Sequence, residues 1–218
     1  MRFTLYYHPL ASFCHKVLIS LYDNAIPFTP VIVDLADETS QEAFRKIWPP
    51  LKFPVLVDAV SSETIAESAS IILYLDAVAQ PATRMATAKP WQATMWDRLF
   101  DDMLQLPMQK IVIDSLRPAD VRDPHGVTEA RENLVRAYAF FEQRTPETGF
   151  WLGPQFSLAD CSAVPALFWS DTVNPLGDSY PKLKDYFNRL KQRPSVARVL
   201  REAEPYFHMF PLEPKPAI

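Results

Sequence analysis

Residues 48–68, WPPLKFPVLVDAVSSETIAES, contain the side chains best suited to binding a small polar ligand. Pro54 opens an apolar strand, and a proline in this position leaves Phe53 free to direct both of its backbone groups away from the sheet. With a cis peptide bond before Pro54, Phe53 could pair antiparallel with an extended peptide ligand. The alternative is an ordinary edge strand that begins at Pro54. Lys52 offers a cation for a carboxylate of the ligand, or is simply an exposed lysine.

Glu67 and Ser68 stand directly before the apolar helix pattern SIILYLDAV. The free N–H groups and the positive dipole end of a helix attract a carboxylate there, and Ser68 can both cap the helix and bind. The Glu67 carboxylate could hold an ammonium group, so the pair suits an α-amino acid end such as a γ-glutamyl moiety. The alternative is a plain capping serine beside a solvated acid.

The turn HPLASFCHKV, residues 8–17, is a third candidate, because a helix N-terminus lowers the pKa of a nearby thiol. An incoming thiol would ionise there. Ser12 is the hydroxyl nearest to that position, and Tyr7, at the end of the preceding strand, is the other possible donor. Ser12 could instead be a simple helix cap, and Tyr7 a core aromatic residue with its hydroxyl at the rim. Cys14 is predicted to be buried rather than reactive.

Hydrophobic periodicity predicts the elements that position these residues. Strands are expected over residues 2–7, 27–35, 53–59 and 62–68, and helices over 12–24, 40–47 and 68–79. Ser12 and Ser40 are expected to open their helices. This order is typical of an α/β domain with a mixed sheet.

The alternation of strands and helices stops after residue 79, so two domains are predicted. Residues 1–79 form the α/β domain, 80–90 a polar linker, and 91–218 an all-helical domain of five or more helices. A kink or break is expected near Pro107, and an interruption at Pro165. The proline-rich tail after Pro205 is expected to be an extended strap.

Composition excludes several classes of function. The 218 residues carry a net charge of −4, with 22 Lys and Arg scattered among 26 Asp and Glu, so no footprint for nucleic acid is present. Only two cysteines occur, far apart and without metal-ligand spacing, which argues against a disulfide framework and against a metal site. Neither a signal peptide nor an apolar run of membrane-spanning length is visible. A cytoplasmic protein without a membrane partner is expected.

Five blocks, in order along the chain, resemble the cytosolic glutathione transferases. ASFCHKVLISL resembles the family's Ser-Pro-Phe-Cys-like turn before an apolar helix, and WPPLKFPVL its Asn-Pro-x-Gly-Lys-Val-Pro-x-Leu segment. ESASIILYL matches Glu-Ser before Ile-x-x-Tyr-Leu, and GPQFSLADC resembles a capping box closed by Ser157 and Asp160. YPKLKDYFNRLKQRPSV resembles the penultimate helix and the start of the last.

The resemblance implies a thioredoxin-like N-terminal domain and a helical C-terminal domain in a homodimer. It implies that glutathione is the co-substrate, and that its thiolate is joined to a small hydrophobic electrophile. It further implies that the bond before Pro54 is cis and that Phe53 pairs with the cysteinyl part of glutathione. Glu67 and Ser68 would hold the γ-glutamyl end, and Lys52 would lie near the glycine carboxylate.

The sequence departs from the serine-type and cysteine-type bacterial members, which it otherwise resembles, at the activating residue. Ala11 occupies that position and its side chain donates no hydrogen bond. The thiol would then be activated by Ser12, by a backbone N–H of the first turn, or by Tyr7. Tyr7 matches the tyrosine of the tyrosine-type classes, but Ser12 is slightly favoured. Trp48 and Leu51 also replace the usual Asn and Gly, which enlarges the apolar surface beside the groove and suits a dimer contact.

The acceptor pocket is expected between the first turn and the long helix that follows the linker. Its predicted lining is His8, Leu10, Ala11, Trp96, Phe100, Met103 and Leu104. Such a lining favours apolar electrophiles, although a stripe of methionine and aromatic residues is also typical of a core. Two alternatives stay open: a non-catalytic regulatory or interaction protein of the same fold, in which Ala11 records the loss of activity, and a specialised glutathione-dependent isomerase or dehalogenase.

Overall fold

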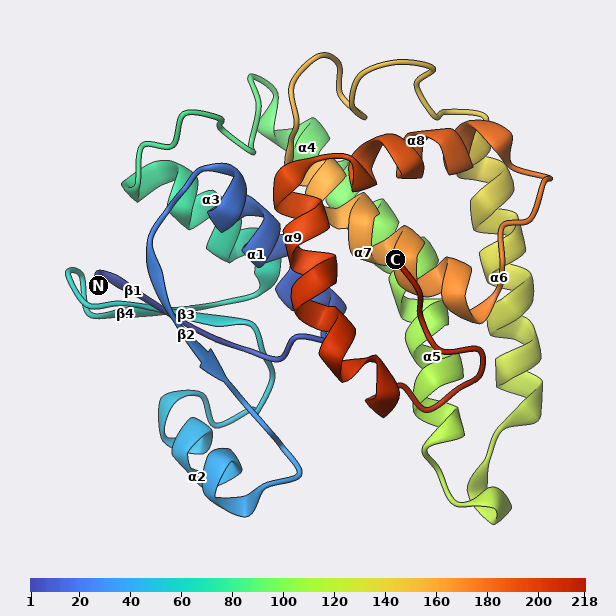
Figure 1. The fold of residues 1–218 in the computed structure, drawn as a ribbon, viewed down its shortest axis with the longest axis horizontal. Helices are drawn as coiled ribbons and strands as arrows, with labels where there is room; N and C mark the ends of the chain where they lie inside the picture. Colours follow the sequence, from blue (N-terminus) through green and yellow to red (C-terminus); the bar gives the residue numbers. More distant parts are fainter.

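A four-stranded mixed sheet forms the first layer of the protein. The computed structural model describes residues 1–218 and is shown in Figure 1. The strands are β1 (Phe3–Tyr7), β2 (Phe28–Ile32), β3 (Val55–Asp58) and β4 (Glu63–Ala66), in the spatial order β2-β1-β3-β4. β1 runs parallel to β2 and antiparallel to β3, and β3 runs antiparallel to β4. The expected mixed sheet is therefore confirmed.

Three helices accompany the sheet: α1 (Ser12–Asp23), α2 (Glu38–Ile47) and α3 (Ser68–Val78). α1 and α3 contact each other, and α1 also contacts helices of the second half of the chain. α2 packs separately, through Phe44, which forms a small buried cluster with Val33 and Val55. Figure 1 shows α2 apart from α1 and α3. Buried residues alternate along β1, because successive side chains of a strand point to opposite faces of its sheet.

The second half of the chain is helical, as expected. Its elements are α4 (Pro90–Phe100), a π-helical turn (Asp101–Gln105), α5 (Leu106–Ser115), a 3₁₀ turn (Ala119–Val121), α6 (Pro124–Glu142), α7 (Leu158–Val173), α8 (Pro181–Lys191), α9 (Pro194–Ala203) and a 3₁₀ helix (Glu204–Met209). The mixed sheet with its helices is thioredoxin-like, and the predicted fold class is confirmed. No helix is both long enough and apolar enough to span a membrane.

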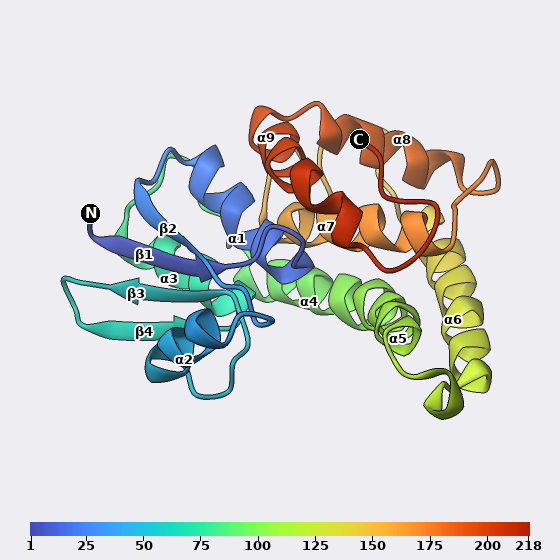
Figure 2. The same ribbon diagram turned by 60° about the horizontal axis from the view of Figure 1, so that its bottom comes forward.

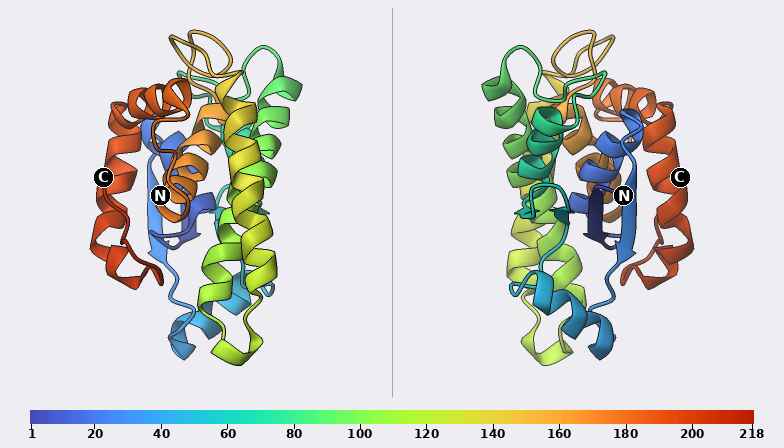
Figure 3. Two further views of the ribbon diagram at one scale, coloured as in Figure 1. Left: turned by 90° about the vertical axis from the view of Figure 1, so that its right-hand side faces the viewer. Right: turned by 90° about the vertical axis from the view of Figure 1, so that its left-hand side faces the viewer.

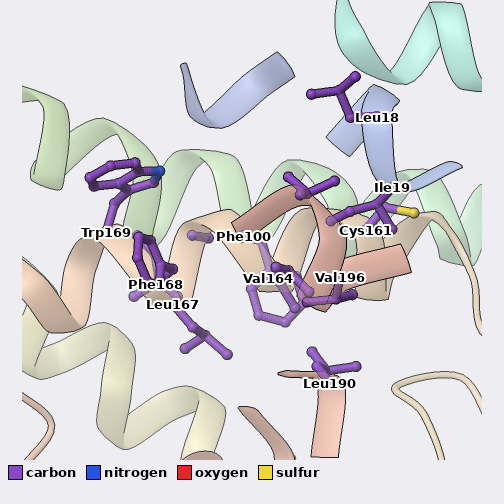
Figure 4. Close-up of a cluster of buried hydrophobic side chains, with 14 of the residues drawn as sticks. Leu18, Ile19, Phe100, Cys161, Val164, Leu167, Phe168, Trp169, Leu190 and Val196 are labelled. Carbon is purple, nitrogen blue, oxygen red and sulfur yellow. The ribbon is translucent and has the colours of Figure 1, made fainter. Parts of the chain in front are cut away.

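α7 is the central helix of this half. Figure 3 shows it between α5 and α6 on one side and α8 and α9 on the other, and it also contacts α1. Fourteen of its 16 residues are buried, which explains why its sequence lacks a polar face. Figure 4 shows Cys161 of α7 beside Ile19 of α1, and Val164 and Leu167 belong to the same buried cluster as Leu18. A single core therefore joins the sheet domain to the helices.

The prolines interrupt the helices less than the sequence suggests. Pro107 lies in the first turn of α5, where its missing N–H costs no intrahelical hydrogen bond. The irregularity falls just before it, in the π-helical turn. Pro165 lies inside α7 without ending the helix. Pro205 lies in the first turn of a 3₁₀ helix, so the extended strap expected from there on was wrong for residues 205–209.

The expected helix caps of α1 and α2 were wrong. Ser12 is the first residue of α1, its N-cap is Ala11, and no side chain caps the helix. α2 begins at Glu38, two residues before Ser40, and is capped by Asp37, whose side chain accepts a hydrogen bond from the Ser40 amide. In each case the serine sits one or more positions inside the helix, where its side chain cannot serve as the N-cap.

The capping box at the start of α7 is confirmed. Ser157 and Asp160 exchange the two hydrogen bonds that define it. The Asp160 carboxylate also accepts from the Trp151 amide and from the Tyr186 hydroxyl, at 2.8 and 2.7 Å. One buried carboxylate therefore ties the start of α7 to α8 and to the loop before α7.

Candidate functional site

The sheet register brings three distant segments of the chain together. Val55, the first residue of β3, pairs with Tyr6 near the end of β1 and with Ala66 at the end of β4. Residues that precede β3, follow β1 and follow β4 therefore meet at one end of the sheet. These are the three segments that the sequence singles out for chemistry.

A cavity of about 390 Å³ lies at this end of the sheet. Its lining includes all five residues predicted to bind glutathione: Lys52, Phe53, Pro54, Glu67 and Ser68. The remaining lining comes from the starts of α1 and α3, from Trp48, and from α4 and the π-helical turn. The structure thus brings the predicted binding residues into one cavity.

Phe53 has its backbone groups free at the cavity wall. The peptide bond between Phe53 and Pro54 is cis, as the resemblance implies. Phe53 precedes β3, and its amide and carbonyl form no hydrogen bond within the protein. Its ring stacks on His8, with 6.1 Å between ring centroids, and lies 6.4 Å from the ring of Phe44. An extended ligand can therefore pair with this backbone without displacing a bond of the protein.

The chain bends sharply between β4 and α3, and the bend faces the same cavity. Glu67, the N-cap of α3, has φ of 66°, a conformation that costs a residue other than glycine on the order of 1 kcal/mol or more. The amides of Ser68, Ala69 and Ser70 form no hydrogen bond within the protein; the first α3 amide that does is that of Ile71, to the Glu67 carbonyl. Three free N–H groups at a helix N-terminus are suited to a carboxylate. Ser68 does not cap α3 with its side chain, which corrects the expected cap.

A buried charged cluster, which the sequence analysis missed, lies beside this cavity. Lys16 of α1 is almost completely buried, and its Nζ lies 2.5 Å from Asp97 Oδ1 and 2.8 Å from Asp101 Oδ2. Both carboxylates line the cavity. Burial raises the pKa of Asp101 to about 6, against the lowering effect of Lys16. Two aspartates four residues apart share one helix face, and this signal could have indicated a partner for a buried lysine.

A second, more apolar cavity of about 280 Å³ adjoins the first, and Phe13 and Phe53 line both. Ser12, Leu10 and Ala11 also line it. Its other walls come from Gln105, α5, Trp169 of α7 and the C-terminal residues 209–211. An apolar cavity beside a polar one can hold the hydrophobic partner of a polar co-substrate.

Ser12 lines the second cavity and directly precedes Phe13, which lines both. Its side chain is buried, and its Oγ accepts a hydrogen bond of 2.5 Å from Gln105 Nε2. The amides of Ser12 and Phe13, in the first turn of α1, form no hydrogen bond within the protein. The hydroxyl and the first-turn amides, two of the predicted donors, are thus near each other.

Tyr7, the other predicted hydroxyl donor, lines neither cavity. Its side chain is on the buried face of β1, and its edge borders a separate surface groove with Tyr22, Arg198 and Glu202. Burial raises its pKa. The strand register gives the reason, because Tyr7 follows Phe3 and Leu5 on the core face.

The predicted acceptor residues divide between cavity and core. Leu10 and Ala11 line the second cavity. Phe100 and Leu104 are fully buried in the core, so their assignment to the pocket was wrong. Trp96 packs against the rings of Phe141 and other aromatic residues.

His8 and Met103 line neither cavity. His8 stacks on Phe53, and Met103 packs against the core. The actual apolar walls are Met108, Val112 and Ile113 of α5. α4 turns its aromatic stripe towards α6 and α7, whereas α5, after the π-helical turn, presents its own side chains to the cavity. A periodic pattern does not tell which of two successive helices lines a pocket.

Two further residues of α1 are excluded from the chemistry. Cys14 is fully buried, and burial raises the pKa of its thiol, which confirms that it is buried rather than reactive. His15 is also fully buried, and burial lowers its pKa to about 4. Its Nε2 lies 2.6 Å from the Pro9 carbonyl. Both side chains hold α1 in place.

Comparison with known proteins identifies one family in both halves of the chain. Residues 5–83 match the family model of the glutathione S-transferase N-terminal domain, and residues 124–189 match the model of the C-terminal domain. Glutathione S-transferase A of Pleuronectes platessa is 29% identical over 141 residues, which cover 62% of this chain and 63% of the plaice protein. The match thus spans less than two thirds of that relative.

Two longer matches agree with this family. Maleylacetoacetate isomerase maiA of Aspergillus fumigatus is 24% identical over 218 residues, 94% of this chain and 92% of that protein. A glutathione S-transferase of Methylobacillus flagellatus, solved with glutathione bound, has a TM-score of 0.81 at 21% identity and covers 90% of this chain and 98% of its own. The match to the Methylobacillus flagellatus structure shows a shared fold over nearly the whole chain.

Proposed function

Because this chain belongs to the glutathione S-transferase family, we propose that it is a glutathione transferase that joins the glutathione thiolate to a hydrophobic electrophile. One observation carries this proposal. The five residues predicted to hold glutathione line a single cavity, and that cavity shares Phe13 and Phe53 with a more apolar one. The first cavity suits a polar tripeptide, and the second suits an apolar acceptor.

Each part of the tripeptide has a suitable partner in the first cavity. The free backbone of Phe53 pairs with the cysteinyl residue, and the free amides at the start of α3 receive the γ-glutamyl carboxylate. The Glu67 carboxylate holds the γ-glutamyl ammonium group, and Lys52 lies near the glycine carboxylate. This assignment leaves the thiol at Phe53, where the cavities adjoin.

The chemistry then requires a thiolate at neutral pH. The Ser12 hydroxyl and the first-turn amides of α1 stabilise the sulfur anion, since Ser12 lines the second cavity and its neighbour Phe13 lines both. A thiol pKa lowered by about two units corresponds to roughly 3 kcal/mol. The thiolate attacks the electrophilic carbon and forms a carbon–sulfur bond. A leaving group departs with the electron pair in a substitution, or the adjacent carbon takes a proton in an addition.

We also propose that the protein is a homodimer and that its domains divide at residues 80–90. The chain between α3 and α4 has no regular secondary structure, which supports a linker there. Exposed apolar side chains, Trp91 and Met95 of α4 and Val60 of the β3–β4 turn, support a contact with a second copy. Light scattering after size exclusion measures the mass, and 24.9 kDa would show a monomer.

The alternative is a glutathione-binding protein without transferase activity. Ala11 favours it, because this residue offers no side-chain donor where serine-type and cysteine-type members have one. Retention on immobilised glutathione is expected for both functions. Turnover of a generic aryl halide with glutathione is expected for the transferase alone. The similarity to an isomerase makes the isomerisation of a conjugated diketo acid a second substrate class for the same assay.

The test of the binding site compares two glutamates at opposite ends of β4, Glu63 as its first residue and Glu67 directly after its last. Glu67→Gln removes a charge from the cavity, whereas Glu63→Gln removes one from the exposed start of β4. We expect the first change to raise the KM for glutathione about tenfold or more, equivalent to about 1.4 kcal/mol. We expect the second to leave it unchanged. The proposed site would be refuted if both substitutions changed the KM for glutathione equally, or if immobilised glutathione did not retain the parent protein.

A further inference from the structure

Gln105 is a buried polar residue in the π-helical turn of the helical domain. It ends the π-helical turn between α4 and α5, and it is about 1% exposed. Such turns are rare and are frequently found at functional sites. Two polar side chains of this turn reach α1: Asp101 binds Lys16, and Gln105 binds Ser12. Figure 2 shows the start of α1 beside the junction of α4 and α5.

The hydrogen bond to Ser12 is the single polar contact of the Gln105 side chain. Nε2 donates to Ser12 Oγ, and Oε1 is buried without a partner. A buried amide that lacks part of its hydrogen bonding lowers stability, and methionine of similar size would fill the same space without that cost. A buried group of this kind calls for an explanation other than packing.

The direction of this bond determines what the Ser12 proton can do. A hydroxyl has one proton and two lone pairs. Gln105 donates to a lone pair, and no protein group accepts the proton. A serine in a helix can donate its proton to a carbonyl one turn earlier, but Ser12 Oγ forms no such hydrogen bond, and its one bond is the bond that it accepts from Gln105. The Ser12 proton therefore remains available for a ligand.

We infer that Gln105 is a positioning residue, which holds the Ser12 hydroxyl as a hydrogen-bond donor to the glutathione sulfur. The inference rests on the proposed function, since it needs a thiolate beside Ser12. Gln105 does not touch the sulfur. It acts by occupying a lone pair of Ser12, so that the hydroxyl has its proton pointing towards the ligand rather than towards the protein.

The experiment reverses the direction of the hydrogen bond between residue 105 and Ser12 without moving either residue. Gln105→Glu replaces the donor with a group that accepts from Ser12, and Gln105→Met removes the bond at similar volume. The readout is the pKa of the bound thiol, measured from the ultraviolet absorbance of the thiolate during a pH titration with glutathione. Gln92→Glu, on α4 outside both cavities, is the control for an added charge. Thermal unfolding of each variant reports whether it folds.

The expected result is a shift of the thiol pKa that depends on Ser12. Gln105→Glu raises it by about one unit, which lowers the turnover at pH 6 about tenfold, and Gln105→Met raises it by about half a unit. The KM for glutathione stays within about twofold of the parent value. In the Ser12→Ala background, neither change of Gln105 shifts the pKa further, because the hydroxyl through which Gln105 acts is gone.

Two results would overturn the inference alone. Gln105→Glu could raise the thiol pKa equally in the Ser12→Ala background, which would mean that the carboxylate acts directly through its charge. Alternatively, Ser12→Ala could raise the pKa while both Gln105 variants lower only the melting temperature, which would mean that Gln105 is structural. A parent protein that forms no thiolate with glutathione below pH 8 would instead refute the proposed function, and the inference with it.

Discussion

Lys16 Nζ lies 2.5 Å from Asp97 Oδ1, and both side chains are about 1% exposed. This buried pair joins α1 of the sheet domain to α4 of the helical domain. Ser162 of α7 donates to the same carboxylate oxygen, at 2.5 Å. Charges removed from water in this way are tolerated because each has a partner within hydrogen-bond distance.

Removing one member of this pair should destabilise the whole protein. Lys16→Met leaves two buried aspartates without their cation, and such a change typically costs about 3–5 kcal/mol. Denaturant unfolding followed by circular dichroism measures it. Arg136→Ala breaks an exposed ion pair with Glu132 on α6 and should cost less than about 1 kcal/mol. A loss for Lys16→Met no larger than that of the control would show that the cluster contributes nothing to the domain interface.

Asp101 should make the stability depend on pH. Its pKa is about 6 in the folded protein and 3.8 as the ordinary value, so between these values the folded state binds the proton more tightly than the unfolded state. The stabilisation from the protonated form is complete below about pH 4 and is lost as the pH rises through 6. The full difference is on the order of 3 kcal/mol. Asp101→Asn should flatten this part of the profile, which unfolding curves from pH 4 to 8 would reveal.

The expectation would be contradicted if the stability of the parent protein rose between pH 4 and 6, and if Asp101→Asn removed this rise. It would mean that Lys16 outweighs burial and lowers the pKa of Asp101. Asp102→Asn is the control, because its carboxylate is half exposed and pairs with Arg98 at the surface. We expect this variant to follow the parent profile.

The second cavity should determine the size of electrophile that is accepted. Val112 of α5 lines it and is only partly buried, so Val112→Phe fills part of the 280 Å³ without changing the core. We expect kcat/KM for a bulky aryl halide to fall about tenfold or more, while the KM for glutathione stays constant. Steady-state kinetics with a small and a bulky electrophile measures the difference. Val135→Phe, on the exposed side of α6, should affect neither substrate.

Lys52 should recognise the glycine carboxylate of glutathione. Lys52→Met is expected to raise the KM for glutathione about fivefold to tenfold, corresponding to roughly 1 kcal/mol, and to reduce its dependence on salt. Glutathione esterified at the glycine carboxylate is the matched ligand. The parent protein should bind this ester as weakly as the variant does. If Lys52→Met weakened the binding of free glutathione and of the ester equally, Lys52 would not contact this carboxylate.

Local sequence determined the polar half of the candidate site. Residues 48–68 and the turn before α1 meet because each borders a strand of one small sheet, and the alternation and proline signals that define the strands also define their ends. The family resemblance that these local blocks carry predicted Phe53, Glu67 and Ser68 as neighbours, whereas the residue pattern alone left an ordinary edge strand and a plain capping serine open. The capping box of Ser157 and Asp160 is local in the same way.

The tertiary structure alone decided the apolar half and the buried polar contacts. Phe100 and Val112 have similar side-chain chemistry, but the first lies in the core and the second in the cavity, because packing of whole helices determines which face is covered. The contact of Gln105 with Ser12 joins residues 93 positions apart through a π-helical turn. A sequence period reports one face of one helix, whereas this contact depends on how two helices are placed against each other.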